Sequence, residues 1–188
     1  VHSDFLALPY GNDQDLRNSD ANNLASSLGP VGVKPSTFVN RKIINGSRLQ
    51  QSPGTWSGLV NSELAQSSFV KMNLEIIDAD ETERTVRYRI ILSYNQNAPN
   101  HNLGFYLTES EIIAEQLDGS VKISNYEHEF VLRQSISPLI GANIGSDVTQ
   151  NTVIIKEFKI DIDDYDTNKL WTMNHVYEGA FVRLDNDD

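Results

Sequence analysis

Two stretches in which apolar and polar residues alternate constrain the fold of this chain more than any other feature. From Val70 to Ile76 every second side chain is apolar, and the same alternation returns from Val86 to Tyr94. The acidic run Asp78 to Glu81 lies between them. Successive side chains of a β-strand point to opposite faces of a sheet, so this period predicts two strands that each bury one face. The stretches therefore predict a β-hairpin packed on a core.

The rest of the second half has the character of strands joined by polar turns. Clusters of Gly, Asn, Pro and Asp separate its apolar runs. Together with the hairpin this makes six predicted strands, which favours a β-sandwich. Because the alternation starts at Phe69, we place a domain boundary near Ser67, so that residues 68–188 form the sandwich domain and residues 1–67 precede it. The further predicted strands are Leu103 to Thr108, Glu129 to Gln134, Val153 to Ile162 and Tyr177 to Leu184.

A helix is predicted near the start of the chain, from about Asp20 to Leu28. Ser19 can cap its free N-terminal amides, and apolar residues recur at the spacing of one helical face. Gly29 followed by Pro30 ends the helix. The predicted helix is amphipathic, with Asn and Ser on its other face.

The next segment predicts a short hairpin and a second helix. Ser36 to Arg41 is typical of a strand, Asn45-Gly46 favours a tight turn, and a second strand follows around Ser47 to Gln50. A helix capped by Thr55 is expected to run to about Gln66. The predicted fold class is therefore α+β: an α-β-β-α half followed by a mainly antiparallel β-sandwich.

Such a half cannot bury its apolar faces well alone, so something must cover the edge of the strand Ser36 to Arg41. We expect its neighbour from outside residues 4–66: from sequence upstream of Val1, from the following domain, or from a partner chain such as a second copy in a homo-oligomer. The polar run Gln66 to Ser68 leaves little slack, which predicts that the two parts pack together.

Composition excludes several kinds of chemistry and partner. The chain has no cysteine, which excludes disulfides, thiol nucleophiles and thiolate zinc sites. Its formal net charge of -11 argues against a nucleic-acid surface, because phosphate binding depends on clustered Lys and Arg. No apolar run approaches the roughly 18 to 20 residues of a membrane-spanning helix, and any targeting signal would lie upstream of Val1.

Three motifs carry a resemblance to a known family. They are VKPSTFVNR at residues 33–41, TWS at residues 55–57 and YEHEFVLR at residues 126–133. In these motifs the chain resembles the 28-kDa outer-membrane protein family of Gram-negative bacteria, which joins a thioredoxin-like domain to a β-sandwich. The resemblance implies a cell-envelope location and makes the first part of this chain a partial thioredoxin-like half. The motif residues that we single out are Pro35, Trp56, Tyr126, His128 and Arg133.

The resemblance also makes predictions about Pro35 and about redox chemistry. Thioredoxin-like folds place a cis proline beside the active site, so Pro35 is expected to be cis, with an ordinary trans proline at a strand start as the alternative. The cysteine pair of such folds lies before the strand to which Val1 to Ser3 would correspond. The reactive part of such a fold is therefore absent from these residues.

His128 lies between two carboxylates of the third motif. Alternation places Glu127 and Glu129 on the opposite face of a strand from His128, which favours a structural histidine that donates to a backbone carbonyl. No second histidine or thiolate lies at the spacing of a zinc site.

An acidic run near the end of the chain is a candidate for calcium binding. Asp161, Asp163, Asp164 and Asp166 could offer the oxygen ligands that calcium prefers. The run lacks the glycine and the glutamate that an EF-hand loop requires at fixed positions. The alternative is a turn capped by Asp side chains.

Arg84, Arg87 and Arg89, with Lys71 across the hairpin, could form a basic strip on an otherwise acidic protein. The strip could bind an anionic partner, or it could be a solvated sheet face on which Glu75 and Glu83 are the cross-strand partners. The second interpretation is favoured.

Three functional hypotheses remain. The leading one is a noncatalytic cell-envelope protein that acts in binding or assembly, with a protein or glycan as its ligand. In the second, the chain is the remainder of a thiol-disulfide oxidoreductase, which a Cys-x-x-Cys upstream of Val1 and insulin reduction by the intact protein would support. In the third, the sandwich is a carbohydrate-binding module, which a glycan array tests. No cofactor is expected apart from the calcium candidate.

Overall fold

The alternating stretches form the predicted hairpin. In this computed structural model, which describes residue 16 and residues 19–28, 36–118 and 120–184, β3 (Val70–Asp80) pairs antiparallel with β4 (Thr85–Tyr94). The turn occupies residues 81–84, later than the acidic run that we expected to form it. The reason is that Asp78 and Asp80 still pair with β4, beyond a register shift that follows Ile76.

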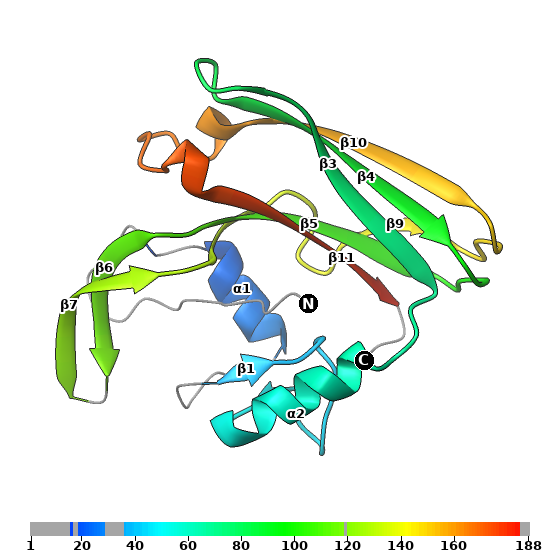
Figure 1. The fold of residues 1–188 in the computed structure, drawn as a ribbon, viewed down its shortest axis with the longest axis horizontal. Coiled ribbons are helices and arrows are strands. Elements are labelled where there is room, and N and C mark those ends of the chain that lie inside the picture. The colour runs from blue at the N-terminus through cyan, green and yellow to red at the C-terminus, as the bar shows by residue number, and fades with distance from the viewer. Residues whose placement is uncertain (1–15, 17–18, 29–35, 119, 185–188) are drawn as a thin grey trace.

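Two antiparallel sheets form the sandwich (Figure 1). In the first, β10 (Val153–Asp161) pairs with β4, which gives the order β10-β4-β3. In the second, β5 (His101–Glu109) lies between β11 (Val176–Leu184) and β8 (Val131–Ser135), and the short β9 (Ala142–Gly145) also pairs with β5.

The apolar faces of the two sheets pack against each other and form the core. Ile90 of β4 and both Phe105 and Leu107 of β5 are 0% exposed. Tyr88 meets Phe105 edge to face, with ring centroids 5.2 Å apart. Each large side chain contributes about 1.5–3 kcal/mol by leaving water, so burial of the two alternating faces stabilises this arrangement. The predicted β-sandwich is confirmed.

The sequence prediction missed three of the nine strands that the structure describes between residues 70 and 184. They are β9, β6 (Ile112–Asp118) and β7 (Val121–His128). β6 and β7 pair only with each other, and their hairpin projects from one end of the sandwich (Figure 1). A register shift between Ala114 and Gln116 interrupts the alternation by which such strands are recognised.

One predicted strand starts later than expected. We expected a strand from Glu129, but β8 begins at Val131. The intervening Phe130 has a φ of 53°, in the left-handed region, where a strand cannot continue.

The N-terminal elements follow in the predicted order. Asn45 and Gly46 have φ angles of 53° and 83°, as a tight hairpin turn requires, and the two short strands beside them pair antiparallel. The four elements are α1 (Ser19–Leu28), β1 (Thr37–Phe38), β2 (Leu49–Gln50) and α2 (Pro53–Leu64).

Boundaries of two of these elements differ from the prediction for reasons that the backbone shows. β1 ends before Arg41 because Asn40 and Arg41 have φ angles of 47° and 57°, which turn the chain out of the strand. α2 begins at Pro53, with Ser52 in the cap position instead of Thr55, because the fixed φ of proline suits the first turn of a helix.

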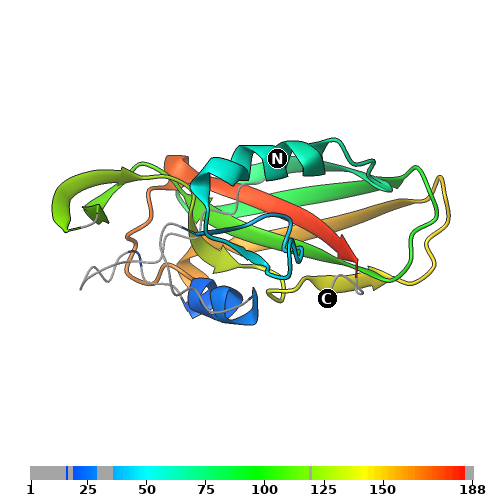
Figure 2. The same ribbon diagram turned by 90° about the horizontal axis from the view of Figure 1, so that it is seen from below.

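β1 has a strand neighbour within the N-terminal part and further contacts from the sandwich. The strand neighbour is β2, so the expectation of a neighbouring strand from outside residues 4–66 was wrong, whereas the following domain, one of the expected sources of cover, makes contacts at Arg41. Nη1 of Arg41 donates to the carbonyl of Leu139 at 2.9 Å, and its guanidinium carbon lies 4.0 Å from the centroid of the Phe181 ring. Seen from below, α1, β1 and α2 lie on the same side of the second sheet (Figure 2).

Some expectations about this part stay predictions. The thioredoxin-like half and the boundary near Ser67 are not established by this architecture, and Pro35 lies outside the described residues. Neither helix in the described part of the chain has the length and apolar content that crossing a membrane requires.

Candidate functional site

Several connections between strands meet at one end of the sandwich, which we call the loop end. β3 and β10 finish there, β4 and β11 begin there, and β5 leaves the second sheet there to enter the β6–β7 hairpin (Figure 1). The connection from β10 to β11 spans residues 162–175 and contains short 3-10 helices at Ile162–Asp164 and Met173–His175. Two ionic networks hold this connection in place.

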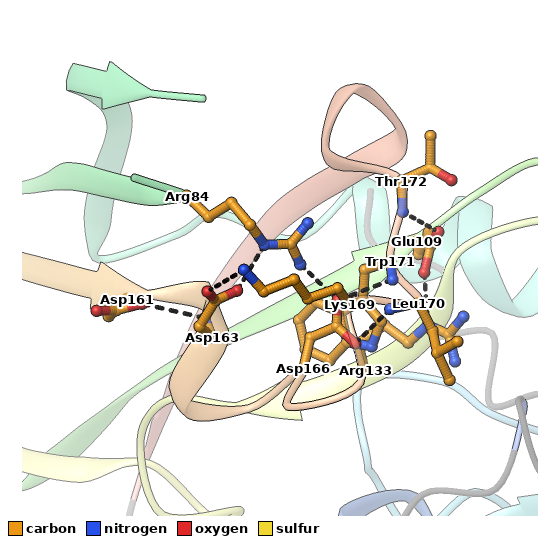
Figure 3. Close-up of polar contacts among 10 residues, drawn as sticks. All are labelled: Arg84, Glu109, Arg133, Asp161, Asp163, Asp166, Lys169, Leu170, Trp171 and Thr172. Atoms are coloured by element: carbon orange, nitrogen blue, oxygen red, sulfur yellow. Dashed lines mark hydrogen bonds and ion pairs between the residues drawn. The ribbon is translucent and has the colours of Figure 1, made fainter. Parts of the chain in front are cut away.

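The first network is centred on Arg84, in the turn before β4. Its Nε donates to Oδ1 of Asp163 at 2.7 Å, and its Nη2 donates to Oδ2 of Asp166 at 2.5 Å (Figure 3). Nζ of Lys169 lies 3.2 Å from the other carboxylate oxygen of Asp163. Desolvation would raise the pKa of Asp163, but the hydrogen bonds and charges of Lys169 and Arg84 outweigh it and hold this pKa below its usual value.

Asp166 is buried and holds the connection by hydrogen bonds to its backbone. Its side chain is 3% exposed, and its two carboxylate oxygens accept the backbone N–H groups of Leu170 and Trp171, both at 2.8 Å. A buried carboxylate is costly unless it is paired and hydrogen-bonded, and here Arg84 and the two amides satisfy it. Asp166 therefore holds the loop that follows it and joins that loop to the turn before β4.

The second network starts from Glu109, the last residue of β5. Its Oε2 accepts from Nε of Arg133 at 2.7 Å, and its Oε1 accepts the backbone N–H of Thr172 at 2.8 Å (Figure 3). The Glu109 and Arg133 side chains are only 4% and 10% exposed. The guanidinium of Arg133 also lies 5.9 Å from the centroid of the Trp171 ring. The connection is thus tied to both sheets, to the first through Arg84 and to the second through Glu109.

The Asp side chains of the calcium-candidate run make different contacts from one another. Asp161 caps the first 3-10 helix by accepting the N–H of Asp163 at 3.1 Å, as the alternative of an Asp-capped turn predicted. Asp163 and Asp166 both face Arg84, while Asp164 is exposed. Among the residues that the structure describes, no three His, Cys, Asp or Glu side chains are placed to hold a metal ion.

The family-motif residues have separate positions. His128 is 6% exposed and meets the Tyr126 ring edge to face at 4.9 Å, and the expected donation to a backbone carbonyl stays a prediction. Nε1 of Trp56 donates to the carbonyl of Gln50 at 3.2 Å and ties α2 to β2. Of these residues, Arg133 takes part in the networks of the loop end.

The arginines of the basic strip pair with acidic residues other than the predicted Glu75 and Glu83. Arg89 stands opposite Glu75 in the sheet, yet its Nη2 pairs with Oε1 of Glu157 on β10 at 2.7 Å, and Arg87 lies 3.8 Å from the same carboxylate. Sequence reasoning also missed the pairing of Glu109 with Arg133. No local spacing could have indicated it, because β5 and β8 become neighbours only in the folded sheet.

Apolar side chains are exposed around the anchored loop. Tyr165 and Leu170 are 40% and 58% exposed within the β10–β11 connection. Phe130 and Tyr177, at the starts of β8 and β11, are 46% and 43% exposed. On the projecting hairpin, Ile113 is 61% exposed. The loop end thus combines a fixed scaffold with accessible apolar groups, an arrangement suited to binding.

These features define a β-sandwich protein with one anchored, partly apolar end. The profile of the family described as "Outer membrane protein Omp28" matches residues 22–186, so the chain belongs to this outer-membrane protein family and to the cell envelope. This confirms the resemblance seen in the sequence.

A solved structure has a similar fold. HBP35 of Porphyromonas gingivalis superimposes with a TM-score of 0.63 at 15% sequence identity. The match covers 89% of this chain and 54% of that chain, so this chain spans about half the length of HBP35. No curated protein matches the chain significantly.

Proposed function

We propose that this chain is a noncatalytic binding or assembly domain of the cell envelope and that it contacts its partner through the loop end. The supporting observation is the pair of ionic networks, which fixes a long connection in one conformation while Tyr165 and Leu170 stay exposed on it. Fixing a binding loop before the encounter lowers the entropy that association must overcome. Apolar groups on a rigid support are therefore more useful for binding than the same groups on a loose loop.

The ionisable groups of this end favour binding over catalysis. Glu109 accepts from Arg133 and from a backbone amide, and Asp166 accepts from Arg84 and two backbone amides. A general acid or base must be free to exchange a proton with a substrate. The lone pairs of these two carboxylates are directed at protein donors, so they serve the architecture.

Site-specific photocrosslinking in the cells that make the protein tests this proposal. A benzophenone side chain introduced at Leu170 or at Ile113 is expected to capture a discrete envelope partner. Val153 is the matched control, because it is 58% exposed like Leu170 but lies at the start of β10, at the opposite end of that strand from the loop end. Equal capture from Val153, or none from either loop-end position, would contradict the proposal.

A further inference from the structure

Two exposed aromatic rings form a pair at the base of the projecting hairpin. The centroids of the Phe130 and Tyr177 rings are 6.1 Å apart, with 57° between the ring planes. Both side chains remain more than two-fifths exposed, at 46% and 43%. Large apolar side chains usually gain stability by burial, so this pair contributes little to the core.

Phe130 has a strained backbone conformation that hydrogen bonds stabilise. Phe130 has a φ of 53°, in the left-handed region that a bulky side chain disfavours. Its N–H donates to Oγ of Ser110 at 3.0 Å, and the N–H of Ser110 donates to the carbonyl of His175 at 3.0 Å. Ser110 is 3% exposed, so these hydrogen bonds are buried. They link the β5–β6, β7–β8 and β10–β11 connections. Strain that displays a ring to solvent indicates a role outside the core.

Two exposed carboxylates adjoin this link along the chain. Glu111 follows Ser110 and is 53% exposed, with its Oε2 3.3 Å from Nε2 of His175. Glu129 directly precedes Phe130 and is also exposed. The chain as a whole carries a formal charge of -11. An anionic membrane surface or a second copy of the chain would therefore be repelled, whereas a cationic partner would be attracted.

We propose that this aromatic-acidic patch, formed by Glu111, Glu129, Phe130, His175 and Tyr177, binds a basic segment of a partner protein. Arginine or lysine side chains of the segment stack on the two rings and pair with the two carboxylates. A guanidinium suits this site best, because it is planar, weakly hydrated and able to meet a ring face and a carboxylate together. The proposal rests on the proposed function and specifies the chemistry of its partner.

Binding of a fluorescent oligo-arginine peptide, followed by anisotropy at low and at physiological salt, tests the patch. Phe130→Asn removes the ring but keeps a residue that tolerates the left-handed backbone, so the variant should fold. Phe130→Asn and Tyr177→Ala are each expected to weaken binding about fivefold, the usual effect of losing one cation–π contact. Glu129→Gln and Glu111→Gln are expected to weaken it about twofold or more, and less so at higher salt.

Two control variants separate a site from general attraction to an acidic protein. Ile155→Ala removes an apolar side chain that is 56% exposed near the start of β10, at the opposite end of that strand from the loop end, and Asp147→Asn removes one exposed charge from the β9–β10 connection. Both should bind the peptide as the parent does. The proposal is overturned if either control loses as much affinity as the patch variants, or if the patch variants lose none.

A neutral oligosaccharide serves as a second probe. Saccharide binding that is insensitive to salt and is lost in Phe130→Asn would overturn the basic-segment proposal in favour of a glycan. Photocrosslinking from Leu170 and Ile113 would be unaffected by that result, so failure of this inference and failure of the proposed function are distinguishable.

Discussion

At the scale of single residues, the loop end depends on buried charges that satisfy one another. Glu109 and Arg133 are the clearest pair, because both are almost fully buried and Glu109 also holds the Thr172 amide. Breaking such a pair by removing one partner is far more costly than its net contribution, since it leaves the other charge buried and uncompensated.

Glu109→Ala is therefore expected to lower the free energy of unfolding by about 3–5 kcal/mol, which chemical denaturation measures. The double variant Glu109→Leu with Arg133→Met replaces both charges by apolar groups and should recover much of this loss. No recovery in the double variant would show that the Thr172 contact, rather than the uncompensated charge, dominates.

Asp163 predicts a pH dependence at the same scale. Its pKa is lower in the folded protein than in the unfolded chain, so its stabilisation is fully present above the unfolded pKa of about 4 and is lost as the pH falls through the folded pKa. Asp163→Asn should be less stable than the parent at neutral pH. The difference should shrink as acid is added, and a difference that is constant down to the acid limit would contradict this origin.

At the scale of elements, β5 and β11 pair by placing aromatic rings over glycines. Gly104 stands opposite Phe181, and Gly179 stands opposite Tyr106. A Cβ at Gly104 would lie 2.0 Å from the Phe181 ring. The guanidinium of Arg41 also contacts this ring, so the ring has little room to move away from the added Cβ. The apolar runs of the sequence predicted both strands. The pairing of each glycine with an aromatic ring could not be predicted, because it depends on the register between the two strands.

Gly104→Ala is expected to destabilise the protein by roughly 1–3 kcal/mol through this overlap. Gly58→Ala is the matched control, because no atom lies within 4 Å of the added Cβ in the exposed helix α2, where alanine should stabilise by about 0.5–1 kcal/mol. Thermal unfolding of the two variants should thus shift in opposite directions. A shift of the same sign in both would remove the steric explanation.

At the scale of the whole molecule, the N-terminal elements and the sandwich are joined by a few specific contacts. Arg41 reaches both Leu139 and Phe181, and Oδ2 of Asp20 accepts the N–H of Ser135 at 2.8 Å. None of the residues of α2 is buried. The position of this helix is therefore held by the contacts of neighbouring elements with the sandwich, and not by an apolar core of its own.

Arg41→Asn keeps a residue suited to the left-handed backbone and removes the guanidinium. We expect hydrogen exchange to become about tenfold faster in β1 and β2 while exchange in β4 and β5 stays unchanged, because about 1.4 kcal/mol of attachment is lost without affecting the sandwich core. Lys159→Ala, at an exposed position of β10, is the control. Faster exchange throughout the sheets would show instead that the two parts unfold as one unit.

The sequence by itself determined the elements whose signals are local. The period of two in β3 and β4, the Asn45-Gly46 turn and the amphipathic α1 each depend on neighbouring residues, and the family could be recognised from short motifs. Only the tertiary structure decided which side chains of those elements come into contact. The projecting hairpin, the pairing of Glu109 with Arg133 and the display of Phe130 beside Tyr177 join residues far apart in the chain. Such contacts depend on register and sheet order, which no spacing along one segment encodes.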